Sequence, residues 1–193
     1  MTARRSATGE RSYRAGRDFF DRPADRVARA LLGATLRVRE GRSARAVRIV
    51  ETEAYVRNDP ASHAFRGPTP RNRSMFSRPG TLYVYRIHQV VCANLVARRG
   101  EAVLLRAGAT GAFPPRTASG PGRLCRFLGL SLDDDGADAV AGRRVEVRLP
   151  ARGVGSFLVG ARVGIRKAAE RPLRFAVPGD PSVSRPRSLR APR

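Results

Sequence analysis

The sequence is poor in the residues that most often bind metals or form disulfides, with two cysteines and two histidines among 193 residues. Cys92 and Cys125 lie too far apart in the chain to form a Cys-x-x-Cys ligand pair, and two histidines are few for a metal centre. We therefore expect both cysteines to be reduced thiols of a cytoplasmic protein, and we expect no metal site.

Long apolar runs are also missing. No segment approaches the roughly 20 consecutive apolar residues of a transmembrane helix, and no signal peptide opens the sequence, so a membrane role is not expected. Apolar residues nevertheless make up 41% of the chain, which separates it from a disordered basic polypeptide and is enough to build a core.

Acidic residues and lysine are scarce as well. The chain has 16 acidic residues against 38 basic ones, a formal net charge of +22, and Lys167 is its only lysine. Arginine side chains bind phosphate oxygens through two hydrogen bonds and stack on bases. The first partner to consider is therefore a polyanion, most simply nucleic acid.

The order of polar and apolar segments predicts one domain. Residues 1–17 are expected to form a flexible basic arm, residues 18–184 the folded domain, and residues 185–193 a basic tail. Helices are predicted over 24–32 and 123–128. Strands are predicted over 35–39, 46–50, 81–87, 90–96, 102–105, 145–149, 157–159, 163–165 and 173–177.

The strand predicted over 46–50 runs directly into two carboxylates and a tyrosine. If it continues, alternation places Ile49, Glu51, Glu53 and Tyr55 on one face. A carboxylate at the point where a strand leaves the core is costly to desolvate, so it is either paired or used in chemistry. Taken alone, the stretch favours acids that pair with some of the many arginines.

Residues 56–80 form the longest expected loop, which is rich in Pro, Asn, Ser and Arg. A loop of this length inside a compact domain is usually functional or disordered, and its apolar residues argue for order. Arg71 and Arg73 suit either a phosphate grip or an ordinary solvated loop. In the following strand, Tyr83 and Tyr85 share a face and suit either the core or a platform for stacking bases.

Nine short motifs, in order along residues 18–184, resemble the alkyladenine (3-methyladenine) DNA glycosylase family of the mixed α/β type found in mammals and many bacteria. They are Phe19-Phe20-Asp21-x-Pro23, Leu31-Leu32-Gly33, Ile49-Val50-Glu51-Thr52-Glu53-Ala54-Tyr55, Thr69-Pro70-Arg71-Asn72-Arg73-x-Met75-Phe76, Pro79-Gly80-Thr81-Leu82-Tyr83-Val84-Tyr85, Leu104-Leu105-Arg106-Ala107, Gly120-Pro121-Gly122-x-Leu124-Cys125, Arg162-Val163-Gly164-Ile165 and Pro172-Leu173-Arg174-Phe175.

The resemblance implies an α+β fold, in which one domain is built around a curved, largely antiparallel sheet with surrounding helices and a protruding β-hairpin that enters the DNA minor groove. It implies hydrolysis of the N-glycosidic bond of alkylated, and by extension deaminated, purines by an activated water, which leaves an abasic site. No metal or other cofactor is implied. The expected partner is double-stranded DNA containing damaged purines, bound by a cytoplasmic, nucleoid-associated monomer.

The resemblance also implies roles for matching positions. Glu53 is similar to the general base that deprotonates the water, and Arg106 to the residue that helps hold that water. Tyr55, His63 and Tyr85 are similar to the family residues that enclose the extruded base and read it. Asn94 resembles the pocket residue that crowds a guanine amino group. Glu51 is assigned only a structural or field role.

Contacts with DNA are expected from two segments. Thr69, Arg71 and Arg73 belong to the first. The second departs from the family's pattern, because residues 86–94 are one residue shorter than the usual segment with its aromatic wedge. His88 stands at or beside the position of the intercalating tyrosine, and the alternative wedges are Gln89 and Met75.

Two other classes of function fit parts of the sequence. A non-catalytic basic nucleic-acid-binding protein on the same scaffold would be favoured by loss of Glu53, which is present. A nucleotide hydrolase would not need the arginine excess. No lysine is placed to form a Schiff base at the site, so strand cleavage is not expected. The range of lesions stays open, including hypoxanthine and etheno bases.

Overall fold

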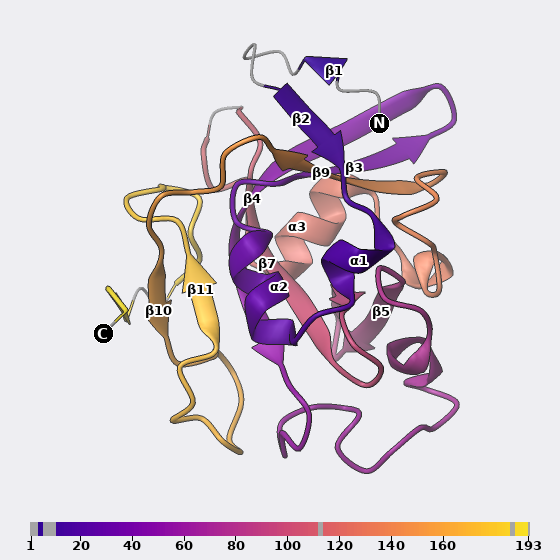
Figure 1. Ribbon diagram of the computed structural model, residues 1–193, viewed down its shortest axis with the longest axis vertical. Helices are drawn as coiled ribbons and strands as arrows, with labels where there is room; N and C mark the ends of the chain where they lie inside the picture. The colour runs from indigo at the N-terminus through magenta and orange to yellow at the C-terminus, as the bar shows by residue number, and fades with distance from the viewer. Residues whose placement is uncertain (1–3, 6–10, 112–113, 186–187, 193) are drawn as a thin grey trace.

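The structure is a computed structural model that describes residues 4–5, 11–111, 114–185 and 188–192 (Figure 1). Its helices are α1 (Arg17–Phe20), α2 (Ala24–Ala30) and α3 (Pro121–Leu128), with 3-10 turns η1 (Arg73–Phe76) and η2 (Leu132–Asp134). Its strands are β1 (Arg4–Arg5), β2 (Arg11–Arg14), β3 (Thr35–Glu40), β4 (Ser43–Tyr55), β5 (Leu82–Ile87), β6 (Val90–Val96), β7 (Ala102–Ala109), β8 (Ala118–Ser119), β9 (Val145–Pro150), β10 (Leu158–Gly160), β11 (Arg174–Ala176) and β12 (Leu189–Arg190).

The described strands form one curled antiparallel sheet. Its main path runs β1-β2-β9-β3-β4-β11-β10-β12. β7 pairs with the opposite edge of β4 and connects it to β6, β5 and β8. Few helices accompany this sheet, so the predicted α+β fold with a largely antiparallel sheet is confirmed.

The central strand β4 is irregular where the two acids lie. Its register with β7 shifts on both sides of Glu51. A shift of this kind changes which face successive side chains occupy, and Ile49 and Ala54 consequently both join the main core. Glu51 and Glu53 instead both contact Arg106. The prediction that Ile49 shares their face is therefore wrong, and the strand does not end before them.

Helices α2 and α3 pack against the sheet and share its main core. Val27 and Leu31 from the α2 region and Leu124 and Leu128 of α3 are buried in the same apolar cluster. The backbone N–H of Ala24, at the start of α2, donates to the Glu101 carboxylate at 2.8 Å. An anion at a helix N-terminus accepts from an otherwise unpaired backbone N–H, and it interacts favourably with the positive end of the helix dipole.

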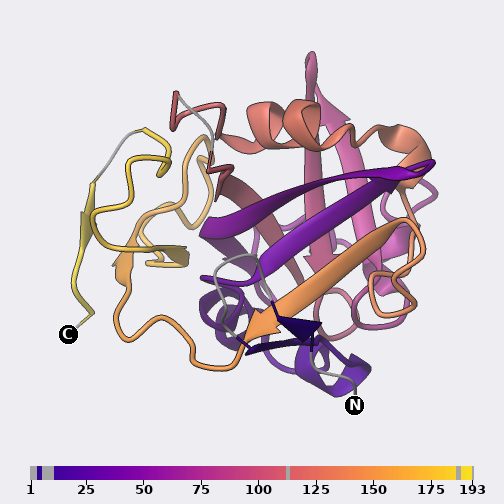
Figure 2. The same cartoon turned by 90° about the horizontal axis from the view of Figure 1, so that it is seen from above.

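The β5–β6 hairpin projects from the body beside α3 and is seen as the spike at the top of Figure 2. Ile87 pairs with Val90, so His88 and Gln89 form the predicted turn. His88 adopts φ of 51°, a left-handed conformation common in short hairpin turns. A Cβ on Gly122 of α3 would lie 2.7 Å from Val90 Cγ1, so a glycine is needed where α3 approaches the hairpin.

Several predicted elements have other bounds in the structure: the strand expected over 46–50 spans Ser43–Tyr55, and the helix expected over 24–32 ends at Ala30. The strand expected over 102–105 continues through Arg106 to Ala109. The helix expected from 123 begins at Pro121, because proline fits the first turn of a helix. Residues 163–165 are not a strand, since Gly164 has φ of 77° and the Val163 N–H donates to a side chain rather than to a neighbouring strand.

The predicted arm (1–17) and tail (185–193) lie partly outside the described residues, namely at 1–3, 6–10, 186–187 and 193. In their described parts, β2 pairs with β9 and β12 pairs with β10. These portions of both ends therefore extend the sheet, and the division into arm, domain and tail stays a prediction.

Candidate active site

A row of paired residues crosses neighbouring strands and brings several of the predicted site residues to one face. Arg174 pairs with Glu53, Glu53 with Leu104, Leu104 with Asn94, and Asn94 with Tyr83. Residues directly opposite each other on adjacent strands point to the same side of a sheet. Residues distant in the chain, such as Glu53 and Asn94, therefore reach the same region.

This face borders a cavity of about 280 Å³. At roughly 30 Å³ for each water molecule, that volume has room for a bicyclic base. Its surroundings are mostly apolar and aromatic, and they come from β4 to β7, the loop before β5, the start of α3 and the segment after β10. The predicted residues among them are Tyr55, His63, Met75, Tyr85, His88, Asn94 and Arg106.

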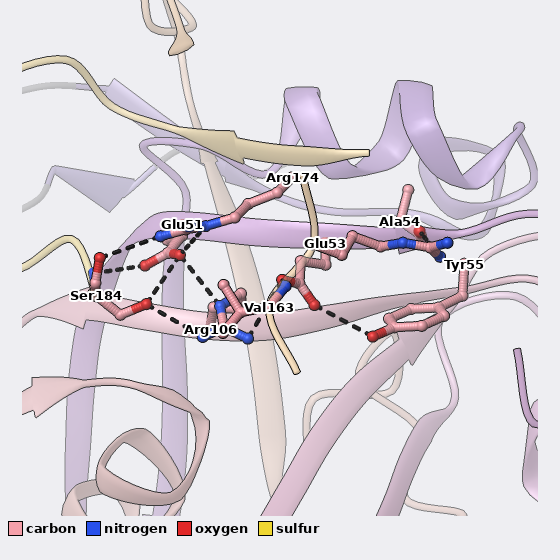
Figure 3. A network of polar contacts seen from close by, with 9 residues as sticks. Glu51, Glu53, Ala54, Tyr55, Arg106, Val163, Arg174 and Ser184 are labelled. Atoms are coloured by element: carbon pink, nitrogen blue, oxygen red, sulfur yellow. Dashed lines mark hydrogen bonds and ion pairs between the residues drawn. The ribbon is translucent and has the colours of Figure 1, made fainter. Parts of the chain in front are cut away.

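Glu53 is fully buried and does not itself line the cavity, but its side chain contacts Tyr55, Arg106 and Val163, which do (Figure 3). Its Oε1 accepts a hydrogen bond from the Val163 N–H at 2.8 Å and lies 3.3 Å from Arg106 Nη1, while its Oε2 accepts from the Tyr55 hydroxyl at 3.2 Å. Burial raises the pKa of Glu53, and the charge of Arg106 opposes that rise only in part. A carboxyl with a raised pKa is a better proton acceptor than an exposed one.

Arg106 lies between the two buried acids. Its Nε donates to Glu51 Oε1 at 3.1 Å and its Nη2 to Ser184 Oγ at 3.2 Å, so Nη1 is the nitrogen that faces Glu53. Burial acts to lower the pKa of Arg106, but the charges of Glu53 and Glu51 outweigh it and raise that pKa overall. The guanidinium is therefore a permanent cation beside Glu53.

Three aromatic side chains meet at the cavity. The His63 and Tyr85 rings lie 4.5 Å apart at 67°, and the Tyr83 and Tyr85 rings lie 5.3 Å apart at 31°. His63 Nδ1 is 2.9 Å from the Tyr83 hydroxyl. His63 is exposed, but partial burial of its ring, together with the charge of Arg71, lowers its pKa. The imidazole is therefore neutral at pH 7.

The tyrosines and Asn94 present neutral polar groups. Burial raises the pKa of Tyr83 to about 12 and also raises the pKa of Tyr55 and of Tyr85, so all three phenols stay protonated. Asn94 is buried, and its Nδ2 donates to the Tyr83 carbonyl at 3.1 Å. Tyr83 was missed as a site residue, although its alternation with Tyr85 was the signal that could have found it.

The loop that carries His63 is organised by Asn72. The Asn72 side chain donates to the carbonyls of His63 at 2.7 Å and Gly67 at 3.1 Å. Its Oδ1 accepts from the Thr69 N–H at 2.6 Å and the Thr69 hydroxyl at 3.0 Å. The residue between the two predicted phosphate-binding arginines therefore shapes the loop.

A second groove of about 580 Å³ adjoins the cavity and shares His63, Tyr83, Ile87 and His88 with it. It is also lined by Thr69 and by three cationic side chains, Arg66, Arg71 and Lys167. Lys167 thus lies closer to the site than its sequence context suggested, although in the groove rather than in the cavity. Arg71 also donates to the Arg86 carbonyl at 3.2 Å, which ties the loop to the hairpin.

The other residues predicted to contact DNA, Arg73, Gln89 and Met75, do not line this groove. Arg73 and Gln89 are exposed and line neither the cavity nor the groove. Met75 is only 2% exposed and packs against Tyr83 and Val96. Its burial argues against Met75 as a wedge at the surface.

A buried ion pair that the sequence analysis missed holds the segment around Val163. Arg162 pairs with Asp59, both buried, and also donates to the Ala54 carbonyl at 3.0 Å. Its guanidinium lies 4.7 Å above the Tyr55 ring. Because Asp59 and Arg162 are 103 positions apart, no local pattern could have revealed this pair.

Within the described residues, histidine, cysteine, aspartate and glutamate side chains form no group of three or more that could hold a metal ion. The helices of this part of the chain are all too short or too polar to cross a bilayer.

Comparison with known proteins identifies the class of protein to which this fold and cavity belong. A family model described as "Methylpurine-DNA glycosylase" matches residues 18–181. The chain is accordingly a DNA glycosylase of the kind that processes alkylated bases in DNA repair. It belongs to the methylpurine-DNA glycosylase family, as its motifs predicted.

Several known proteins are similar to this chain over most of its length. A protein of Agrobacterium fabrum is 43% identical over 185 residues, which span 86% of this chain and 90% of that protein. One of Rhizobium etli is 41% identical, over 88% of each chain, and one of Frankia casuarinae is 42% identical, over 92% of this chain and 95% of its own. Each of the three is named "Putative 3-methyladenine DNA glycosylase".

Proposed function

We propose that this chain turns an alkylated purine out of duplex DNA into the cavity and hydrolyses its N-glycosidic bond with a water activated by Glu53, leaving an abasic site. Deaminated purines form a second substrate class. The observation that carries this proposal is the buried Glu53 carboxylate, with its raised pKa, next to an aromatic cavity with room for a base.

The cavity suits a flipped, damaged base. An enzyme cannot reach the sugar C1′ while the base is stacked, so the nucleotide must rotate out of the duplex and be held between aromatic faces. Tyr55, Tyr85 and the neutral ring of His63 offer such faces. A purine alkylated at N3 or N7 is cationic, and electron-rich rings attract cations. The net charge of +22 supports binding to the phosphate backbone of any DNA sequence.

Glu53 is proposed to act as the base. In the reaction, water oxygen bonds to C1′, the C1′–N bond breaks with its electron pair going to the purine, and the water proton goes to Glu53. Among the described residues, Oε2 accepts one hydrogen bond, from Tyr55, which leaves it a lone pair for the water. A nearby carboxylate also stabilises the positive charge that develops on the sugar. Arg106 and the Val163 N–H hold the other oxygen.

The raised pKa of Glu53 predicts how the rate depends on pH. Water activation requires the ionised carboxylate, so single-turnover release of a neutral lesion should fall as the pH drops through the Glu53 pKa. Because burial raises that pKa, the fall should begin above the ordinary pKa of glutamate. A neutral lesion is used because a cationic base leaves readily on its own. A rate that stays constant down to the ordinary glutamate pKa would contradict the role of Glu53.

Asn94 is proposed to exclude undamaged guanine. Its amide is held by the Tyr83 carbonyl and borders the cavity, where it would meet the exocyclic amino group that distinguishes guanine from adenine on that edge. Asn94→Ser should raise the release of guanine and N-alkylguanine relative to alkyladenine. Competition between the two bases in one reaction measures this ratio, and an unchanged ratio would remove Asn94 from the base-reading role.

The hairpin tip is proposed to fill the gap left by the flipped nucleotide. His88 is exposed at the turn, and the Ile87 and Val90 side chains beside it are 48% and 41% exposed. Inserted side chains help offset an unstacking cost of a few kcal/mol. Losing about 1 kcal/mol of that contribution in His88→Ala should weaken lesion binding roughly fivefold, whereas His88→Tyr, with more stacking area, should strengthen it.

Fluorescence of a base analogue next to the lesion reports flipping directly. Ile87→Ala serves as the comparison, because it truncates the neighbouring side chain and leaves the imidazole in place. If His88→Ala leaves the flipping signal unchanged while Ile87→Ala reduces it, the wedge is Ile87 and the assignment of His88 is wrong.

The position of the lysine supports a monofunctional reaction. Lys167 lies in the adjoining groove with Arg66 and Arg71, where cations suit phosphate binding, and it does not line the cavity beside Glu53. We therefore propose release of the base without a Schiff base and without strand cleavage.

The alternative function, a basic protein that binds DNA without catalysis, makes a different prediction. Release of free base and binding should be measured in parallel on duplexes that carry 3-methyladenine, 7-methylguanine, an etheno base, hypoxanthine or no lesion. Preferential release of the damaged purines supports the proposal. Binding to every duplex without release from any would favour the alternative.

A further inference from the structure

Two acids, Glu51 and Glu53, and two arginines, Arg106 and Arg174, lie close together (Figure 3). Glu51 and Glu53 are fully buried, and Arg174 and Arg106 are 1% and 6% exposed. Their formal charges cancel. Glu51 is predicted to have only a structural or field role and Arg174 has no predicted role, so neither residue has a specific part in the proposed reaction.

Glu51 is surrounded by hydrogen-bond donors. Its Oε1 accepts from Arg174 Nε at 2.6 Å, Ser184 Oγ at 3.0 Å and Arg106 Nε at 3.1 Å. Its Oε2 accepts from the Ser184 backbone N–H at 2.6 Å. Such charge-assisted bonds fix a carboxylate in place. Since these donors already occupy both of its oxygens, Glu51 is unsuited to activating water itself.

The contacts of Glu51 determine how Arg106 meets Glu53. Arg106 Nε is bound to Glu51 and Nη2 to Ser184 Oγ, which leaves Nη1, 3.3 Å from Glu53 Oε1. An unrestrained arginine tends to bind a carboxylate with two parallel hydrogen bonds. That arrangement would occupy both oxygens of Glu53, and Glu51 and Ser184 oppose it.

We infer that Glu51 is a positioning residue, which together with Ser184 turns Arg106 so that one guanidinium nitrogen reaches Glu53 and the second Glu53 oxygen remains able to accept a proton from water. Arg174, directly opposite Glu53 on β11, balances the charge of Glu51. The use of that free oxygen rests on the proposed function, whereas the arrangement of the four side chains does not.

The charges around Glu53 determine in which direction its pKa should move when one of its neighbours is replaced. Removing the negative charge of Glu51 favours the ionised form of Glu53 and lowers its pKa, because the charge of Glu51 helps to raise it. Removing the positive charge of Arg174 should raise that pKa. The groups that face Glu53 are Glu51 and Tyr55 of β4, Tyr85 of β5, Cys92 of β6, Arg106 of β7 and Arg174 of β11.

Two measurements on the same variants test the inference. The first follows the titration of the Glu53 carboxyl by NMR in protein labelled with ¹³C-glutamate and free of DNA, with the signal assigned by its loss in Glu53→Gln. The second is the pH profile of single-turnover release. In both, the Glu53 transition should move to lower pH in Glu51→Gln and to higher pH in Arg174→Gln. It should move least in Ser184→Ala, which changes no charge and leaves Glu51 bound to Arg106 Nε.

The maximal rate separates positioning from charge. Misplacing a catalytic group by about 1 Å can lower a rate roughly 100-fold, so Glu51→Gln should approach that loss and Ser184→Ala should show a smaller one. Ser182→Ala is the matched control, because it removes a buried hydroxyl from the same segment that donates to the Pro115 carbonyl at 2.7 Å and not to Glu51. It should release base at the wild-type rate.

Unmoved Glu53 transitions in folded Glu51→Gln and Arg174→Gln would overturn the inference, as would a wild-type rate in Ser184→Ala. If a charge variant does not fold, the comparison of Ser184→Ala with Ser182→Ala still decides. Since the titration needs no substrate, a wild-type protein that releases no base would contradict the proposed function, while the predicted NMR shifts would still support the positioning role of Glu51.

Discussion

Glu53→Gln should slow single-turnover base release by roughly 100- to 10,000-fold, the usual contribution of a general base. Binding to a duplex with an abasic-site analogue should stay close to wild type. The amide oxygen can still accept the Val163 N–H bond, and the amide NH₂ can donate to the Tyr55 hydroxyl, so the shape of the site is kept. The amide does not take a proton from water, so the loss falls on the chemical step.

Glu101→Gln is the control for this experiment. Glu101 is also buried, but its carboxylate accepts from the Ala24 N–H at the start of α2, whereas Glu53 contacts three residues that line the cavity. It should release base at the wild-type rate. Equal losses in Glu53→Gln and Glu101→Gln, or a small loss in Glu53→Gln, would show that Glu53 is not the base.

Arg106→Met should be both inactive and destabilised. It leaves Glu51 and Glu53 buried near each other without the cation between them, and breaking a buried pair in this way costs about 3–5 kcal/mol of folding free energy. The charge of Arg106 is the largest influence that lowers the Glu53 pKa, so this pKa should rise further in the variant. More Glu53 is then protonated at neutral pH and unable to accept a proton.

The stability of Arg106→Met should depend on pH with a definite sign. A carboxyl whose pKa is higher in the folded state holds a proton that the unfolded state releases, so the free energy of unfolding falls as the pH rises from the unfolded towards the folded pKa. Denaturant unfolding at several pH values should therefore show the smallest deficit at acidic pH. The exposed Arg152→Met is the control and should change stability by less than about 0.5 kcal/mol. A deficit of equal size at every pH would contradict the coupling.

The elements that the sequence predicted well depend on short-range patterns. The β5–β6 hairpin has aromatic and β-branched residues on both sides of His88-Gln89, and its observed bounds differ from the prediction by one residue. Helix α2 carries its apolar positions at helical spacing, although it ends at Ala30, two residues before the predicted end. In both, local preference and burial favour the same conformation.

The site was only partly predictable for a related reason. Tyr55 lies two residues after Glu53 and Tyr85 lies in a strand with a clear pattern, so motifs located them. The Val163 N–H, the Asp59–Arg162 pair and the Ser184 contacts with Glu51 join segments more than 100 residues apart. The irregular register at Glu51 also left no local signal, because it depends on how β4 pairs with β7.

The most direct test of the account is to identify the product released from a duplex that carries one alkylpurine. We expect free alkylpurine, one abasic site for each base released and an unbroken strand, with no protein–DNA adduct after borohydride treatment. Release of the purine still attached to its sugar, or no release from DNA that the protein demonstrably binds, would contradict it.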